Sequence, residues 1–199
     1  MPFFSKPAGL TLVELLISIA VIGILSSIVF VGFYQDRERS AVKRAAEQLQ
    51  VDVQSAQNRA QSGVLTGGSL PAGYGVHFDV ATPDRYLIFA DALSGSPPAG
   101  DNEYRPPPGG TDTIVTTVIL PSRVVVHRIG VISLTFDRGS AVFSVPNAQS
   151  TLRVWDAGGA ASTPSSLPIT LRQTRANLCY SVTIVPSGTV SQRQLDSCS

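Results

Sequence analysis

The sequence predicts an α+β fold in which one long N-terminal α-helix packs on antiparallel β-sheet. Residues 15–33 form an uncharged apolar run, and residues 34–62 lack proline and glycine while apolar side chains recur every three or four positions. Beyond Gly63 the apolar period falls to two, which is typical of strands with one buried face. The sequence has no second long helical segment, so parallel βαβ units are not expected.

The composition of the chain excludes some classes of function. The 199 residues suit one modest domain plus a helical extension. The formal net charge is +1, from 15 basic and 14 acidic side chains, so no overall excess indicates a nucleic-acid-binding or acidic disordered protein. Two cysteines, Cys179 and Cys198, could form a disulfide, half of a metal site or two unrelated thiols.

The apolar run 15–33 predicts a membrane-spanning helix. At ~1.5 Å rise per residue it spans about 28 Å, close to the roughly 30 Å of a bilayer's hydrocarbon core. A secretory signal peptide would have a shorter apolar region and a small-x-small cleavage site, which the sequence VGFYQDRER at the end of the run lacks. A buried core helix is the remaining alternative, because apolar periodicity alone does not exclude it.

The helix is expected to continue to Ser62 and to stop at Gly63. One side of its second half carries an apolar stripe, which should pack on the chain's own globular domain. The stripe consists of Val42, Ala46, Leu49, Val53, Ala56 and Ala60. A basic cluster on other faces could contact lipid head groups, a partner subunit or only solvent. It comprises Arg37, Arg39, Lys43 and Arg44.

Glu14 places a carboxylate near the start of the apolar segment. A charge deep in a bilayer is unfavourable by a few kcal/mol, and by less near a helix end, so a tolerated terminal charge is one explanation of Glu14. The surrounding pattern is more specific. Lys6 lies in a short leader, Gly9 and Leu10 follow, and Glu14 precedes an uninterrupted apolar run. This arrangement resembles the N-terminal signal of type IV prepilins and type II secretion pseudopilins.

The resemblance covers roughly residues 6–62 and implies a processing step. A membrane aspartyl peptidase, the prepilin peptidase, would cut between Gly9 and Leu10 and would methylate the new amine of Leu10. Glu14 would become the fifth mature residue. Its carboxylate and the amine could pair within one helix turn or between adjacent subunits, where the family places the contact. The resemblance therefore implies that Glu14 is an assembly contact.

The resemblance also implies a pilin-like fold with defined boundaries. These are a leader at 1–9, a transmembrane helix half at 10–33, an amphipathic helix half at 34–62 and a β-rich globular domain at 63–199. A second similarity, carried by YGVHFD, YLIFAD and VTIVPSGTV, is to the H-type (GspH/FimT-like) minor pseudopilins. Val31 stands where many major pilins have a kinking proline, and the calcium-loop signature of the major secretion pseudopilin is missing. Both departures favour a minor subunit.

Short strands and turns are expected after the helix. Hairpin turns are predicted at 137–139 and 186–188, and exposed loops at 94–112 and 156–168, which are rich in Gly, Pro or Ser. The expected strands are 74–80, 86–91, 113–120, 124–128, 131–137, 140–145, 152–156, 169–173 and 179–185.

If residues 186–188 turn the chain between antiparallel strands, Cys179 and Cys198 come close enough for a disulfide, whose Cα–Cα separation is about 5–6 Å. The bridge would close a loop of about 20 residues, and a location outside the cytoplasm would permit it. Two free thiols are the alternative.

The sequence predicts neither an enzyme nor a cofactor. His77 and His127 are remote from the cysteines in sequence, so a zinc site is not expected. Ser187 lies in a turn without a nucleophile-elbow context. A loop triplet could hold calcium, but such triplets are more often only solvated. The triplet is Asp101, Asn102 and Glu103.

The expected function is that of a minor pseudopilin or pilin subunit of a type II secretion system or type IV pilus. The expected location is the inner membrane, crossed once, with the C-terminal domain outside the cytoplasm, and later the fibre. The positive-inside rule places the basic residues 37–44 in the cytoplasm, but the resemblance and the paired cysteines outweigh it. Expected partners are the prepilin peptidase, other pilins or pseudopilins, the inner-membrane assembly platform and membrane lipid.

Two alternatives remain open. A minor pilin of a DNA-uptake pilus would need exposed basic residues, but Arg172, Arg175 and Arg193 are a thin set, so DNA is not an expected partner. A bitopic membrane protein could instead anchor an unrelated β domain, and it would not be cleaved at Gly9.

Overall fold

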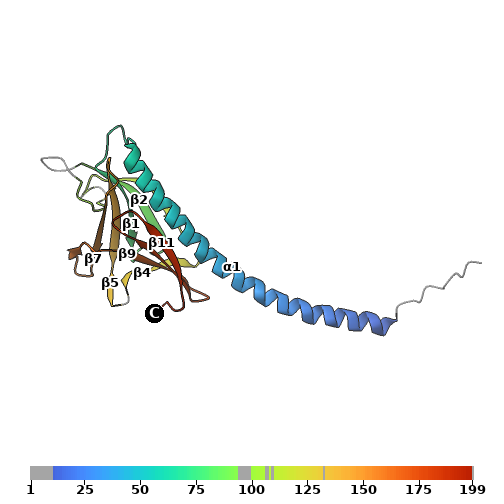
Figure 1. Ribbon diagram of the computed structural model, residues 1–199. Coiled ribbons are helices and arrows are strands. Elements are labelled where there is room, and N and C mark those ends of the chain that lie inside the picture. The colour runs from blue at the N-terminus through green and yellow to red at the C-terminus, as the bar shows by residue number, and fades with distance from the viewer. Residues whose placement is uncertain (1–10, 94–99, 106–107, 109, 132, 199) are drawn as a thin grey trace, which may run out of the picture. The chain divides into compact units, whose positions relative to one another are not determined.

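The computed structural model describes residues 11–93, 100–105, 108, 110–131 and 133–198, with the side chains of residues 28–36 outside the description. Within these residues the chain forms one long helix, α1 (Leu12–Ser62), followed by strands β1 to β11 (Figure 1). The chain divides into two compact units, Met1–Arg37 and Glu38–Ser199. The first unit contains the N-terminal part of α1, and the second contains the rest of α1 and all the strands.

The helix α1 ends where the sequence predicts. Gly63 adopts a left-handed conformation with φ +60°. Gly63 N–H donates to the Ala60 carbonyl at 3.3 Å and Val64 N–H donates to the Arg59 carbonyl at 3.3 Å. This pair of bonds is the Schellman motif, which satisfies carbonyls that the helix leaves without partners. Glycine suits the position because a side chain disfavours a positive φ.

Six strands form one antiparallel sheet in the order β3-β2-β1-β6-β7-β8. The strands are β1 (Gly73–Asp79), β2 (Arg85–Asp91), β3 (Thr113–Ile119), β6 (Arg138–Ser144), β7 (Ser150–Trp155) and β8 (Ala161–Ser162).

Five strands form a second antiparallel sheet in the order β11-β10-β9-β4-β5. They are β4 (Val124–Val131), β5 (Leu134–Phe136), β9 (Leu167–Gln173), β10 (Leu178–Ile184) and β11 (Val190–Leu195). A helix combined with two antiparallel sheets is the predicted α+β class, and it is consistent with a pilin-like fold.

One hydrophobic core joins the second half of α1 to both sheets. The predicted apolar stripe of the helix is fully buried in it, with 0% exposure from Val42 to Ala60 at all six predicted positions. Polar contacts fix the helix at its flanks. Tyr86 of β2 donates its hydroxyl hydrogen to Asp52 at 2.6 Å, and the Gln173 side chain of β9 donates to Glu38. The prediction that the stripe packs on the chain's own domain is therefore confirmed.

Three local predictions are wrong. Residues 137–139 make no hairpin, because β5 pairs with β4 while β6 pairs with β1 and β7 in the other sheet. The expected strand 131–137 is split, since Val131 ends β4 and β5 begins at Leu134. The expected loop 156–168 contains β8 and the start of β9.

The predicted exposed loop 94–112 lies partly outside the described residues. Its last residue, Asp112, is buried with 7% exposure, because it lies against the end of β2. Exposure therefore does not extend over the whole loop.

Candidate functional site

The N-terminal turn of α1 holds Glu14 in a capping arrangement. Glu14 N–H donates to the Thr11 hydroxyl oxygen at 3.2 Å, and Leu15 N–H donates to the Thr11 carbonyl at 3.2 Å. Thr-x-x-Glu is the capping-box pattern, and a carboxylate in the first turn interacts favourably with the helix dipole. The Glu14 side chain is exposed, so its carboxylate is accessible to a neighbouring molecule.

Apolar side chains surround the described N-terminal part of α1 and are open to solvent. Their exposure ranges from 50% at Val21 to 77% at Leu12. The set is Leu12, Val13, Leu15, Leu16, Ile17, Ile19, Val21, Ile22, Ile24 and Leu25. A helix that is apolar on every side requires a covering, which is lipid or other protein.

The described residues include no helix that is both long and apolar enough to cross a membrane. The predicted run 15–33 reaches into residues 28–36, whose side chains lie outside the description. The predicted processing residues Gly9 and Leu10 also lie outside the described residues.

The predicted basic cluster is distributed over both units. Lys43 Nζ lies 3.7 Å from a Glu47 carboxylate oxygen one helix turn away, and Arg44 Nε donates to the Ser40 carbonyl at 3.3 Å. Both contacts lie on exposed helix surface, where an ion pair such as Lys43–Glu47 adds little to stability.

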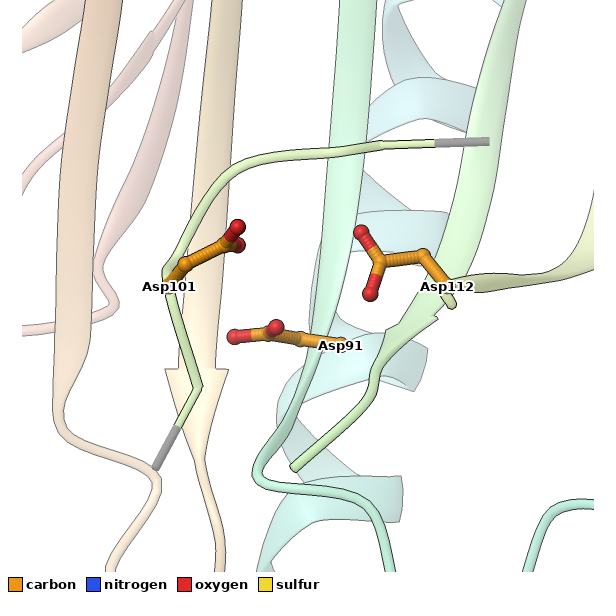
Figure 2. A group of neighbouring side chains, drawn as sticks. All are labelled: Asp91, Asp101 and Asp112. Atoms are coloured by element: carbon orange, nitrogen blue, oxygen red, sulfur yellow. The ribbon is translucent and has the colours of Figure 1, made fainter. Parts of the chain in front are cut away.

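A group of three carboxylates lies in the second unit, where β2 ends beside the start of β3. Asp91 is the last residue of β2, and Asp112 immediately precedes β3. Asp101 comes from the segment that connects the two strands. One carboxylate oxygen from each lies within 4.8 Å of those of the other two. Figure 2 shows the three carboxylates facing one another.

Backbone hydrogen bonds fix Asp112 and Asp101 in this carboxylate cluster. Asp112 Oδ1 accepts from Ala92 N–H at 2.9 Å, and its Oδ2 accepts from Arg105 N–H at 2.7 Å. Asp101 Oδ1 accepts from Glu103 N–H at 3.0 Å. These bonds hold the described residues 101–105 against the strand ends.

Asp91 is the most buried member of the cluster, with 1% exposure. Its Oδ2 accepts from Asn102 N–H at 3.1 Å, while its Oδ1 has no hydrogen-bond partner among the described residues. Gly100 allows this approach, because a side chain there would collide with Asp91 Oδ2 and with Ala72. A buried carboxylate oxygen without a partner is unfavourable, so Asp91 requires a proton or a cation.

The electrostatics of the cluster agree with its geometry. Burial raises the pKa of Asp91 to about 7. Backbone hydrogen bonds from Asn102 and Asp101 oppose the rise, and the charges of Asp112 and Asp101 add to it. Burial also raises the pKa of Asp112. Like charges at this separation disfavour simultaneous ionisation.

The cluster differs from the calcium-binding triplet considered in the sequence. Asp101 belongs to it, but Asn102 contributes only its backbone N–H, and the Glu103 carboxylate accepts from Arg105 Nη2 at 2.8 Å. The sequence analysis did not predict that Asp91 and Asp112 belong to this site. The signal that could have indicated it is their position, since one ends a strand and the other immediately precedes the next strand.

The other candidate side chains have structural partners. His77 Nδ1 lies 2.8 Å from the Ser140 hydroxyl, and burial lowers the pKa of His77 to about 4, so the ring is neutral at pH 7. His127 Nε2 lies 3.2 Å from the Cys198 carbonyl oxygen. The Ser187 hydroxyl lies 3.0 Å from that of Thr189 within the β10–β11 turn.

The C-terminal hairpin and its disulfide are as predicted. β10 pairs with β11 from Ile184 opposite Val190 to Cys179 opposite Leu195, and Gly188 in the turn has φ +80°. Cys179 and Cys198 form a disulfide with a Cα–Cα separation of 5.4 Å.

Three arginines share the outer face of the five-stranded sheet. One row of paired residues crosses the sheet from β11 to β4, in the order Arg193, Ser181, Thr170 and Arg128. Arg172 lies two residues after Thr170 in β9, so it shares the same face. Arg128, Arg172 and Arg193 form no ion pair within the described residues, and the Nε atoms of Arg128 and Arg172 are buried without hydrogen-bond partners there. The predicted Arg175 lies instead in the β9–β10 turn.

Comparison with known proteins addresses the N-terminal region. Residues 4–30 match the family described as "Prokaryotic N-terminal methylation motif". No curated protein and no solved structure matches the chain. The motif supports a type IV pilin-like or pseudopilin-type precursor, and it implies processing by a prepilin peptidase and assembly with other pilins. A prepilin-type N-terminus is also consistent with membrane anchoring before assembly.

Proposed function

We propose that the chain is a minor, non-catalytic subunit of a type IV pilus or of a type II secretion pseudopilus. The observation that carries the proposal is the methylation motif at residues 4–30, placed at the start of a helix whose described N-terminal part has large apolar side chains exposed on all sides. The inner membrane would cover this surface before assembly, and the helices of neighbouring subunits would cover it afterwards. The strand and turn pattern of the domain also resembles that of the H-type minor pseudopilins.

In this proposal the two units have different tasks. Helix packing through the part of the first unit that remains after cleavage, residues 10–37, holds the subunit in the fibre, while Glu38–Ser199 presents a folded domain outside the cytoplasm. The buried stripe of α1 supports this division, because it anchors the helix to the domain without using the exposed apolar residues nearer the N-terminus. The inner-membrane assembly platform would load the processed subunit.

Processing provides the direct test of the proposal. Co-expression with a prepilin peptidase should yield a chain that begins at methylated Leu10, as read by mass spectrometry of the intact protein. Gly9→Val should block cleavage, because a branched side chain next to the scissile bond hinders entry into a narrow peptidase site. Gly63→Ala serves as the control, since it alters a glycine remote from the cleavage site and should be processed normally. A native protein that retains residues 1–9 would contradict the proposal.

DNA capture is a second candidate function for the same subunit. The outer-face arginines Arg128, Arg172 and Arg193 favour it, because guanidinium groups without carboxylate partners are suited to phosphate contacts. The set predicted from the sequence contained Arg175, whereas the set on the sheet contains Arg128 in its place. The neutral overall charge limits the expected affinity.

A gel-shift titration with duplex DNA tests this candidate on the full-length chain in mild detergent. Three phosphate contacts predict a slope of about −2.7 for log K against log salt concentration. Replacing Arg128, Arg172 and Arg193 together with alanine should abolish the shift, while Arg175→Ala should leave it unchanged. If wild-type protein gives no shift at low salt, this second function is excluded and the structural role is unaffected.

A further inference from the structure

The carboxylate cluster of Asp91, Asp101 and Asp112 lacks the positive charge that its burial requires. Neither Asp91 nor Asp112 forms an ion pair with any described arginine or lysine. Asp101 pairs with Arg105, whose Nε lies 3.2 Å from Asp101 Oδ2. Arg105 is also bound to Glu103 and its side chain is 55% exposed, so it neutralises the outer edge of the cluster and not its buried end.

Asp91 Oδ1 points to a ligand independently of the clustering. This atom is buried in a residue with 1% exposure and accepts no hydrogen bond among the described residues, although every neighbouring carboxylate is held by backbone N–H groups. In Figure 2 the carboxylate of Asp91 lies beside the other two, and one of its oxygens lies within 4.8 Å of an oxygen of each. Arg153 approaches from β7, but its Nη1 donates to the Asp101 carbonyl at 2.6 Å and not to a carboxylate.

We propose that Asp91, Asp101 and Asp112 bind a divalent cation, and that the cation is Ca²⁺. Carboxylate oxygens are ligands for hard cations, and Ca²⁺ accepts six to eight of them in flexible geometry, with water and backbone carbonyls completing the shell.

The ligand chemistry favours calcium over magnesium. Ca²⁺ takes six to eight oxygen ligands in flexible geometry, so three carboxylates with backbone carbonyls and water can complete its shell. Mg²⁺ demands near-ideal octahedral geometry, keeps several waters and is usually held by only one or two carboxylates. A group of three carboxylates therefore suits calcium better.

The bound ion would join three segments that backbone pairing alone does not hold together. Ala90 opposite Thr113 is the last registered pair of β2 and β3, so Asp91 and Asp112 lie just beyond the ladder. Asp101 would tie the connecting segment to these two strand ends. The site would thus fix the β2–β3 connection, and it does not depend on the proposed role in a fibre.

The experiment uses the full-length chain in mild detergent after removal of metal with a chelator. Tb³⁺ replaces Ca²⁺ as a luminescent probe and is excited through Tyr104, whose pKa is raised by burial and also by the charge of Asp112. We expect Tb³⁺ luminescence that Ca²⁺ displaces, with a calcium Kd of about 10⁻⁵–10⁻³ M, and a Tm that rises with calcium concentration. Mg²⁺ should compete at least about tenfold more weakly.

Matched variants identify the ligands. Asp91→Asn and Asp101→Asn should each weaken calcium binding at least about tenfold, since each removes one charged oxygen ligand. Glu103→Gln is the control in the same loop and should bind calcium like the wild type. Asp101→Asn keeps the test valid if the buried Asp91→Asn variant folds poorly, because the Asp101 side chain is 31% exposed.

Two results would overturn the proposal. One is a wild-type chain that shows neither Ca²⁺-dependent displacement of Tb³⁺ nor a calcium-dependent Tm, which would leave Asp91 as a protonated acid. The other is undiminished calcium binding by folded Asp91→Asn and Asp101→Asn, especially if Glu103→Gln loses it, which would move the site to the exposed part of the loop.

Discussion

A Glu14→Ala variant is expected to enter the membrane and to be cleaved, but to be absent from purified fibres. Cleavage after Gly9 would leave a positive amine on Leu10, four residues before Glu14. In a helix bundle of low dielectric constant this amine requires a negative partner, and alanine cannot provide one. Membrane insertion should be unimpaired or improved, since the variant lacks a charge that is unfavourable in lipid.

A second variant at position 14 separates the charge of Glu14 from its role in capping the helix. Glutamine at position 14 retains the Thr-x-x-Gln form of the capping box but lacks the charge. Glu14→Gln should therefore fail to assemble if the charge is the contact, and should assemble if only the cap matters. Thr11→Ala is the complementary control, because it weakens the cap by about 1 kcal/mol and keeps the carboxylate.

Membrane insertion and fibre assembly are measured separately, in cells that also express the other pilins. Immunoblots of the membrane fraction report insertion, and immunoblots of sheared fibres report assembly. Wild-type amounts of Glu14→Ala in the fibres would show that the carboxylate is not an assembly contact. Loss of the variant from the membrane fraction would instead contradict the expected insertion.

Local periodicity was sufficient to predict the helix and its packing. The stripe from Val42 to Ala60 is set by the helical repeat, and its burial needs only one apolar partner surface. The stop at Gly63 is equally local, because the capping bonds join residues five or fewer apart. These features could be derived without knowing the strand order.

The same local signals could not predict which strands pair with one another. The sequence around Asp137 has turn-forming residues, yet the chain passes there from the sheet of β4 and β5 to the sheet of β1 and β6. Turn propensity reports a change of direction and does not specify whether the flanking strands share a sheet. The hairpin at 186–188 was correct because β10 and β11 are neighbours in one sheet.

Predicting the carboxylate cluster would also have required the strand pairing. Asp91 and Asp112 are 21 positions apart in sequence and become neighbours only through the pairing of β2 with β3. The composition of the segment between them predicted exposure, whereas the fold brings Asp101 back onto the strand ends. A hairpin prediction for these two strands would have indicated that their terminal aspartates meet.

The disulfide is expected to provide a large part of the stability of the second unit. Cys179 and Cys198 are 19 positions apart, and cross-linking a loop of this size is worth about 3 kcal/mol in the chain-entropy model. β11 is an edge strand with only β10 as a neighbour, and its residues 191–194 are exposed. It therefore has little buried apolar surface of its own, and the C-terminal tail would otherwise fray.

Replacing both cysteines with alanine should lower the free energy of unfolding by about 3 kcal/mol, measured by urea denaturation of the full-length chain in mild detergent. Hydrogen exchange should accelerate most in β11 and in the tail, where the Cys198 carbonyl contacts His127 of β4. Reductant should destabilise the wild type by a similar amount and leave the double variant unchanged. Free thiols in denatured, unreduced protein from the cell envelope, or a wild type that is indifferent to reductant, would refute the assignment.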